Sequence, residues 1–251
     1  DVTSRVGNIL PDKKYTEMTI QKILEKSHNL GTVMVAENIE NEEFYNTWKM
    51  LGFGSSLGLM PGTENPGVLR HYSNWGLADK RSLSFGHGPM NTNLAQLARA
   101  YLVFANEGAI PSLKLFKNNS APDNLVQVFS PESTKRIAEI LDSVASDDGS
   151  GYRAAIDGYS VAGKTGTAEM VVDGKYSKDG AKRTYFIGFS PAENPKYIMA
   201  VRLDYPKKCF VWWDPTMRNR CEGSNSASIA FQKAMKRILI NDPDIKSKLE
   251  G

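Results

Sequence analysis

The sequence is poor in the residues that build metal centres and disulfide frameworks. Its 251 residues include only two cysteines and three histidines, and no other Cys or paired His lies at a spacing that zinc sites use. We therefore expect no metal site. Cys209 and Cys221 lie twelve positions apart (221 − 209). Such a pair is compatible with a disulfide in an oxidising compartment and equally with two unrelated thiols.

Long apolar runs and an excess of charge are also lacking. No apolar stretch approaches the roughly 20 residues that a membrane-spanning helix needs, and no signal peptide opens the sequence. The formal net charge is only +3 and the basic residues are scattered, so no nucleic-acid partner is expected. With 41% hydrophobic and 24% charged residues, the composition is that of an ordinary globular protein.

Hydrophobic periodicity predicts helices in the first part of the chain. The expected helices cover residues 19–26, 41–49 and 92–107, and Gly108 stands where a C-cap glycine belongs. A further helix is expected to start at residues 130–132, where Ser-Pro-Glu supplies a capping hydroxyl, a proline at the first position and an acid in the first turn. Glycine and proline are frequent in residues 52–88, which we expect to be mostly loop.

The period of the pattern then changes to that of strands. Residues 160–172 indicate strand structure, and Asp173-Gly174 is a hairpin-type turn. Strands are also predicted at 185–189 and 197–203, and their short spacing favours antiparallel pairing. A closing helix is expected at 224–239. Helices, then three antiparallel strands, then a helix indicate an α+β fold.

Lys164 fits two unrelated motifs. Residues 158–165 (Gly-Tyr-Ser-Val-Ala-Gly-Lys-Thr) satisfy the phosphate-binding pattern G-x-x-x-x-G-K-[ST], which needs a helix directly after the lysine. Here Gly166 follows Thr165, and the next residues have a strand pattern. A helix is improbable there because glycine and β-branched residues disfavour it. Nucleotide binding is therefore the weaker interpretation.

The second motif is Lys-Thr-Gly on a strand. Residues 27–29 (Ser-His-Asn) form a Ser-x-Asn at the end of a predicted helix, 137 positions earlier (164 − 27). Penicillin-interacting enzymes combine a nucleophilic Ser-x-x-Lys, a Ser-x-Asn and a Lys-Thr-Gly. Ser-x-Asn alone is common in loops, where a capping role explains it. The pair in this order and spacing is more specific.

The runs around these motifs carry a family resemblance. Residues 26–31 (Lys-Ser-His-Asn-Leu-Gly), 84–88 (Ser-Phe-Gly-His-Gly) and 162–168 (Ala-Gly-Lys-Thr-Gly-Thr-Ala), together with 93–101 and 188–192, resemble the class B penicillin-binding proteins. The most similar group is the division-specific peptidoglycan D,D-transpeptidases, often called penicillin-binding protein 3. The resemblance covers nearly the whole chain, except residues 7–14 and 209–222, which look like insertions.

The resemblance implies serine acyl transfer without a cofactor. A serine attacks a D-Ala-D-Ala stem peptide of peptidoglycan, and an amine of a second peptide resolves the acyl-enzyme. β-Lactam antibiotics are attacked in the same way and stay attached. The resemblance implies a proton path through Ser27 and orientation of the substrate by Asn29. Lys164 would supply positive potential, and the hydroxyls of Thr165 and Thr167 would bind the substrate carboxylate. Gly166 would let the substrate approach closely, and the Thr167 amide would form half of the oxyanion hole.

The nucleophile motif is missing. No serine in the 251 residues is followed three positions later by lysine. In the family this motif precedes Ser-x-Asn by a few dozen residues, which places it before Asp1. We therefore expect the chain to be the C-terminal portion, residues 1–251, of one transpeptidase domain. The first strand and the nucleophile helix would then be in a separate chain or deleted, and this chain alone would be inactive.

Three functions are consistent with these residues. The first is a D,D-transpeptidase of cell-wall synthesis and cell division, working with division-complex proteins in the full-length protein. The family implies a periplasmic location, on the inner membrane through an N-terminal anchor. The second is a non-catalytic penicillin-binding-like sensor or binding domain, and the third and weakest is a P-loop nucleotide-binding protein.

Overall fold

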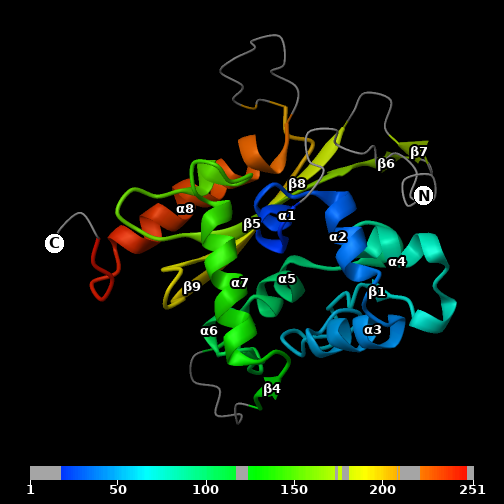
Figure 1. Cartoon of the computed structure of the whole chain (residues 1–251). Coiled ribbons are helices and arrows are strands. Elements are labelled where there is room, and N and C mark those ends of the chain that lie inside the picture. Colours follow the sequence, from blue (N-terminus) through cyan, green and yellow to red (C-terminus); the bar gives the residue numbers. More distant parts are fainter. Residues whose placement is uncertain are drawn as a thin grey trace. The chain divides into compact units, whose positions relative to one another are not determined.

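The computed structural model describes residues 18–116, 124–172, 175–176, 181–207, 209 and 221–247. The chain divides into two compact units, Asp1–Lys135 and Arg136–Gly251. Figure 1 shows helices dominating the first unit and a twisted antiparallel sheet in the second. The α+β class expected from the sequence is confirmed.

Six short helices and two small antiparallel ladders form the first unit. The helices are α1 (Ile20–Glu25), α2 (Asn29–Ala36), α3 (Asn41–Met50), α4 (Leu77–Ser84), α5 (Leu94–Ala100) and α6 (Leu102–Ala105), with a 3₁₀ turn η2 (Tyr72–Asn74). The ladders pair β1 (Val68–Leu69) with β2 (Met90–Asn91) and β3 (Ala109–Ile110) with β4 (Val126–Gln127). These counts refer to the described residues.

The helices at 19–26 and 41–49 are confirmed as α1 and α3, but the predicted helix 92–107 is broken. At Tyr101 the backbone amide donates to Ala98 O instead of Leu97 O, so the chain tightens into a 3₁₀-like turn between α5 and α6. Gly108 has φ +90°, and an added Cβ there would lie 2.1 Å from Phe129 O. Glycine is therefore required where the C-cap was predicted. Helices α2 and α4 were not predicted.

The second unit is built on a three-stranded antiparallel sheet. Helix α7 (Pro131–Val144), which starts at the proline predicted to start it, continues into this unit. After η3 (Tyr152–Ala154) come strands β5 (Ala162–Glu169), β8 (Lys182–Ser190) and β9 (Tyr197–Asp204), in the order β5-β8-β9. Strands β6 (Val171–Val172) and β7 (Lys175–Tyr176) form a separate ladder. The turn predicted at residues 173–174 lies outside the described residues.

One face of the sheet is covered by the C-terminal helix α8 (Ala227–Ile240), which contacts β8 and β9 and follows the 3₁₀ turn η5 (Gly223–Asn225). The contact is apolar: Phe186 of β8 and Phe231 of α8 are fully buried, with ring centroids 4.6 Å apart. Met235 and Leu239 extend the same buried cluster along α8. Burying aromatic and aliphatic side chains stabilises this layer by about 1.5–3 kcal/mol per residue. The sheet that carries Lys164 is therefore held in place by a well-packed helix on one face.

Candidate functional site

The Lys-Thr-Gly-Thr motif lies in the middle of strand β5, with Lys164 opposite Ile187 and Thr167 opposite Thr184 of β8. Among the described residues, β5 pairs only with β8, so its other edge has no strand partner there. Because side chains alternate along a strand, Thr165 and Thr167 share one face with Thr184. The Lys164 side chain starts from the other face, but its Nζ reaches to 3.5 Å from Thr165 Oγ1. A strand through residues 162–169 is incompatible with the helix that a phosphate-binding loop needs after its lysine.

Lys164 has an altered acidity. Its side chain is partly buried, and this burial lowers the pKa of the ammonium from its ordinary 10.5 to about 8, because the charged form is poorly solvated. Its Nζ donates to Thr165 O at 3.2 Å. A lysine with such a pKa exists in both protonation states near neutral to mildly basic pH, which suits a group that works beside a proton-transfer path.

Both threonine hydroxyls of the motif have partners in the second unit. Thr165 Oγ1 lies 3.4 Å from Ser150 Oγ, and the backbone amide of Gly223 donates to Thr167 Oγ1 at 2.9 Å. Neither Ser150 nor Gly223 belongs to a motif, so neither could be predicted as a partner of these threonines. At Gly166 an added Cβ would lie 3.3 Å from Tyr185 Cβ. The protein itself thus leaves limited room for a side chain at Gly166.

The Ser-x-Asn motif forms the turn between α1 and α2 in the first unit. Ser27 is exposed and has φ +54°, the left-handed region. Asn29 is the first residue of α2 and is also exposed. The N-cap of α2 is His28, whose Nδ1 accepts from the Gly31 amide at 3.0 Å. Capping is therefore carried out by His28 and does not explain the presence of Ser27 or Asn29.

The two motifs thus belong to different units, Ser27 and Asn29 to the first, and Lys164 to Thr167 to the second. Within its own unit each motif has a defined backbone structure, a turn into a helix for residues 27–29 and a strand for residues 164–167. Within the described residues no group of three or more His, Cys, Asp or Glu side chains is placed to hold a metal ion. No helix in the part of the chain that the structure describes is long and apolar enough to cross a bilayer.

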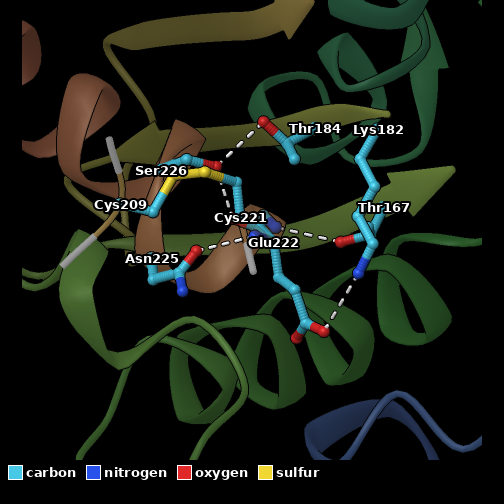
Figure 2. The surroundings of a disulfide bond; sticks show 9 residues. Thr167, Lys182, Thr184, Cys209, Cys221, Glu222, Asn225 and Ser226 are labelled. Carbon is cyan, nitrogen blue, oxygen red and sulfur yellow. Dashed lines mark hydrogen bonds and ion pairs between the residues drawn. A yellow bond between two sulfur atoms is a disulfide. The ribbon is translucent and has the colours of Figure 1, made fainter. Parts of the chain in front are cut away.

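Cys209 and Cys221 are joined by a disulfide, with their Cα atoms 5.3 Å apart. Both side chains are buried in the second unit. Figure 2 shows that the residues directly after Cys221 contact strands β5 and β8 through Thr167, Lys182 and Thr184. The sequence left the choice between a disulfide and two thiols open, and it did not indicate any link between this pair and the Lys-Thr-Gly strand.

Comparison with known proteins gives a consistent result. The family model of the penicillin binding protein transpeptidase domain matches residues 4–235. The probable peptidoglycan D,D-transpeptidase PenA of Neisseria gonorrhoeae is 35% identical over 193 residues, which is 76% of this chain and 32% of that protein. The peptidoglycan D,D-transpeptidase FtsI of Buchnera aphidicola is 34% identical over 239 residues, 92% of this chain and 39% of that protein.

Among solved structures, the apo transpeptidase domain of Burkholderia pseudomallei penicillin-binding protein 3 superposes with a TM-score of 0.77 at 29% identity. That match covers 91% of this chain and 67% of the other. The present chain spans about a third of the length of the curated relatives it matches. With a family match across nearly its whole length, the chain belongs to the penicillin-binding protein transpeptidase domain family.

Proposed function

We propose that this chain is part of a serine-type peptidoglycan D,D-transpeptidase that cross-links stem peptides and is acylated by β-lactams. The observation that carries the proposal is Lys164-Thr165-Gly166-Thr167 on a strand with an unpaired edge among the described residues, with the lysine pKa lowered to about 8. An extended substrate can bind along such an edge, since the strand offers main-chain donors and acceptors in register. The relatives named D,D-transpeptidases support this assignment.

In the proposed reaction, the Lys-Thr-Gly-Thr strand binds the negatively charged carboxylate of the substrate. Lys164 attracts the substrate carboxylate while it is protonated, and Thr165 and Thr167 donate their hydroxyl protons to that carboxylate. The Thr167 amide stabilises the oxyanion that forms as the carbonyl is attacked. Gly166 keeps the strand surface low enough for the substrate to approach it.

The roles proposed for Ser27 and Asn29 are proton transfer and substrate orientation. Ser27 passes a proton to the leaving group, and Asn29 orients the substrate amide. Support for Ser27 comes from its left-handed backbone, because non-glycine residues held in such conformations concentrate at functional sites. That argument is independent of the motif, since it rests on the backbone conformation alone.

The acylated serine is proposed to come from a part of the domain outside these 251 residues. No Ser-x-x-Lys occurs in the 251 residues, and the matched stretches cover only 32% and 39% of two curated relatives. We propose that residues 1–251 are the C-terminal portion of one transpeptidase domain, completed by a separate chain or by a segment of the same gene product. The division role, the partnership with division-complex proteins and the anchored periplasmic location are proposed by likeness to the FtsI-type relatives.

Intact-mass analysis after incubation with a labelled penicillin tests the function. The full-length gene product should gain one acyl group, and the 251-residue chain alone should gain none. Lys164→Ala in the full-length protein should slow acylation about a hundredfold or more, as expected when a group that stabilises the transition state is removed. A full-length protein that binds penicillin reversibly, with no mass increase, would support the sensor interpretation instead.

A further inference from the structure

A disulfide-anchored turn lies directly against the catalytic-motif strand. Cys221 is followed by Glu222, whose amide donates to Asn225 Oδ1 at 2.6 Å, so η5 is closed by its own side chains. Cys221 and Asn225 are both buried. The disulfide to Cys209 fixes the beginning of this turn covalently, and helix α8 continues from its other end. We refer to residues 221–226 as the brace.

The brace contacts β5 and β8 at three points. The Gly223 amide donates to Thr167 Oγ1 at 2.9 Å, the Ser226 hydroxyl lies 2.9 Å from that of Thr184, and Glu222 forms an ion pair with Lys182 at 3.5 Å. Thr184 is the register partner of Thr167. Figure 2 shows these contacts side by side around the disulfide. The brace therefore holds the pair of strand positions that includes the last residue of the motif.

Gly223 lies against the strands with no space to spare. A Cβ added there would lie 2.7 Å from Gly166 O, 2.8 Å from Tyr185 O and 3.1 Å from Gly166 N. Contacts under 3 Å to backbone atoms cannot be relieved by rotating a side chain. The Gly223 main-chain nitrogen donates the hydrogen bond to Thr167, so the bond forms only when the backbone at residue 223 lies this close to the strands.

The hydrogen bond also orients the Thr167 hydroxyl. A hydroxyl has one proton and two lone pairs. Because one lone pair of Thr167 Oγ1 accepts from Gly223, the proton of the hydroxyl is directed away from the brace and is available as a donor. A donor that is already oriented loses less entropy when it binds a carboxylate, and the charge-assisted bond it forms is about twice as strong as a neutral one.

We propose that the Cys209–Cys221 disulfide and the brace position Thr167, so that its hydroxyl proton is presented to the carboxylate of the substrate or β-lactam. The inference rests on the proposed transpeptidase function and adds a specificity-determining element to it. Gly223 and the disulfide act as positioning groups: Gly223 touches Thr167 directly, and the disulfide acts through the brace that it anchors. A purely structural disulfide would stabilise the fold without changing the preference for a carboxylate.

The test compares two ligands that differ only at the carboxylate. The second-order acylation constant of the oxidised full-length protein is measured with benzylpenicillin and with its methyl ester, and their ratio reports carboxylate recognition. Reduction with dithiothreitol, the double variant C209S/C221S and Gly223→Ala should each lower that ratio about five- to tenfold, as expected for a misplaced charge-assisted hydrogen bond. Gly223→Ala keeps the disulfide and so tests the brace even if the cysteine variant does not fold.

Three controls accompany the measurement. Dithiothreitol should not change the ratio for C209S/C221S. Gly76→Ala, whose added Cβ would meet only Asp79 Oδ2 at 3.7 Å, should leave the ratio unchanged. In a Thr167→Val background, reduction should have no further effect, because the hydroxyl to be positioned is gone.

The outcomes separate the two proposals. An unmodified full-length protein that is not acylated by benzylpenicillin overturns the proposed function and this inference with it. Normal acylation with an acid-to-ester ratio that is unchanged by reduction and by Gly223→Ala overturns only the positioning role. A ratio that falls in all three perturbed proteins, and is insensitive to reduction once Thr167 is valine, supports it.

Discussion

Ser27 occupies the position at the end of α1 where glycine is usually found. Its amide donates to Leu24 O at 3.1 Å, and the amide of His28 donates to Ile23 O at 2.9 Å. These two bonds form a Schellman motif, in which the first residue after the cap is left-handed. A serine there has φ +54°, which costs about 1–2 kcal/mol relative to the right-handed conformation. We infer that the hydroxyl is retained for function at the expense of stability.

This inference predicts that Ser27→Gly and Ser27→Ala separate stability from activity. Both variants lose the hydroxyl and should acylate about a hundredfold or more slowly in the full-length protein, as expected when a proton-transfer group is removed. The glycine variant should be more stable than the alanine variant by about 1 kcal/mol, because only glycine adopts φ > 0 without strain. Urea unfolding measures the difference. An alanine variant at least as stable as the glycine variant would rule out the strained backbone.

The lowered pKa of Lys164 predicts that activity falls and stability rises as the pH increases. Its folded pKa of about 8 lies below the ordinary 10.5. Recognition of a carboxylate needs the protonated form, so acylation by benzylpenicillin should fall as pH rises through about 8. Between about 8 and 10.5 the unfolded chain binds more protons at this residue than the folded one, so the Lys164 contribution to the free energy of unfolding becomes more favourable as pH rises.

The control for this prediction is Lys164→Arg, which stays charged across the whole range. Its absolute acylation rate is expected to be lower, but the fall near pH 8 should vanish. The rise of stability with pH should vanish with it in matched urea titrations from pH 7 to 10. A wild-type acylation profile that stays flat up to pH 10 would contradict the charged-lysine role.

At the level of elements, Gln96 connects α5 to the loop that precedes β1. Its side chain is fully buried, and its Nε2 donates to the carbonyls of Gly52, Ser55 and Pro66 at 2.8–3.2 Å. Its Oε1 accepts from the Asn93 amide at 3.0 Å, which caps α5. One side chain therefore satisfies backbone groups of a loop that has no regular ladder of its own to satisfy them.

Gln96→Glu should accordingly destabilise the protein by about 3 kcal/mol or more, since it removes the donors to three backbone carbonyls and introduces a buried charge. The matched control is Gln127→Glu, the same change at an exposed residue whose Nε2 donates to Glu107 O. That control should stay within about 0.5 kcal/mol of the wild type. Urea unfolding of both variants measures this difference, and an equal loss of unfolding free energy in the two variants would refute the role of Gln96.

Helices and strands with a strong hydrophobic pattern could be predicted from the sequence, whereas elements whose structure depends on tertiary contacts could not. Strands β8 and β9 and helix α8 have apolar runs that match their secondary structure, and their expected order is confirmed. Helix α2 was missed because its start is capped by a histidine, outside the usual set of capping residues. The brace was missed because its structure depends on a disulfide and on a close backbone approach by Gly223.

At the scale of the whole molecule, the family could be predicted from the sequence while the arrangement around each motif could not. The Ser-x-Asn and Lys-Thr-Gly motifs, in their order and spacing, are a chemical signature that does not depend on how the chain is packed. The lowered pKa of Lys164, the strained Ser27 and the amide bond to Thr167 depend on burial and on residues distant in sequence. Such features are visible only in the folded chain.

The disulfide also has a consequence for the stability of the second unit. It closes a short loop, with a sequence separation of 12, and a constraint of this size destabilises the unfolded chain by about 3 kcal/mol. Reduction should therefore speed the slowest amide hydrogen exchange of β8 and α8 roughly a hundredfold, the factor that corresponds to about 3 kcal/mol. Native-state hydrogen exchange with mass spectrometry of the 251-residue chain measures this.

The amides of α2 and α4 serve as the internal control, because every described contact of the disulfide and the brace named above lies in the second unit. Their exchange should change by less than about threefold, since mutations and cross-links act locally when sites share no partners. Equal acceleration in both units would mean that the chain unfolds as one cooperative body. In that case the change on reduction would report global stability, and the brace would have no separate local effect on the strand that carries Thr167.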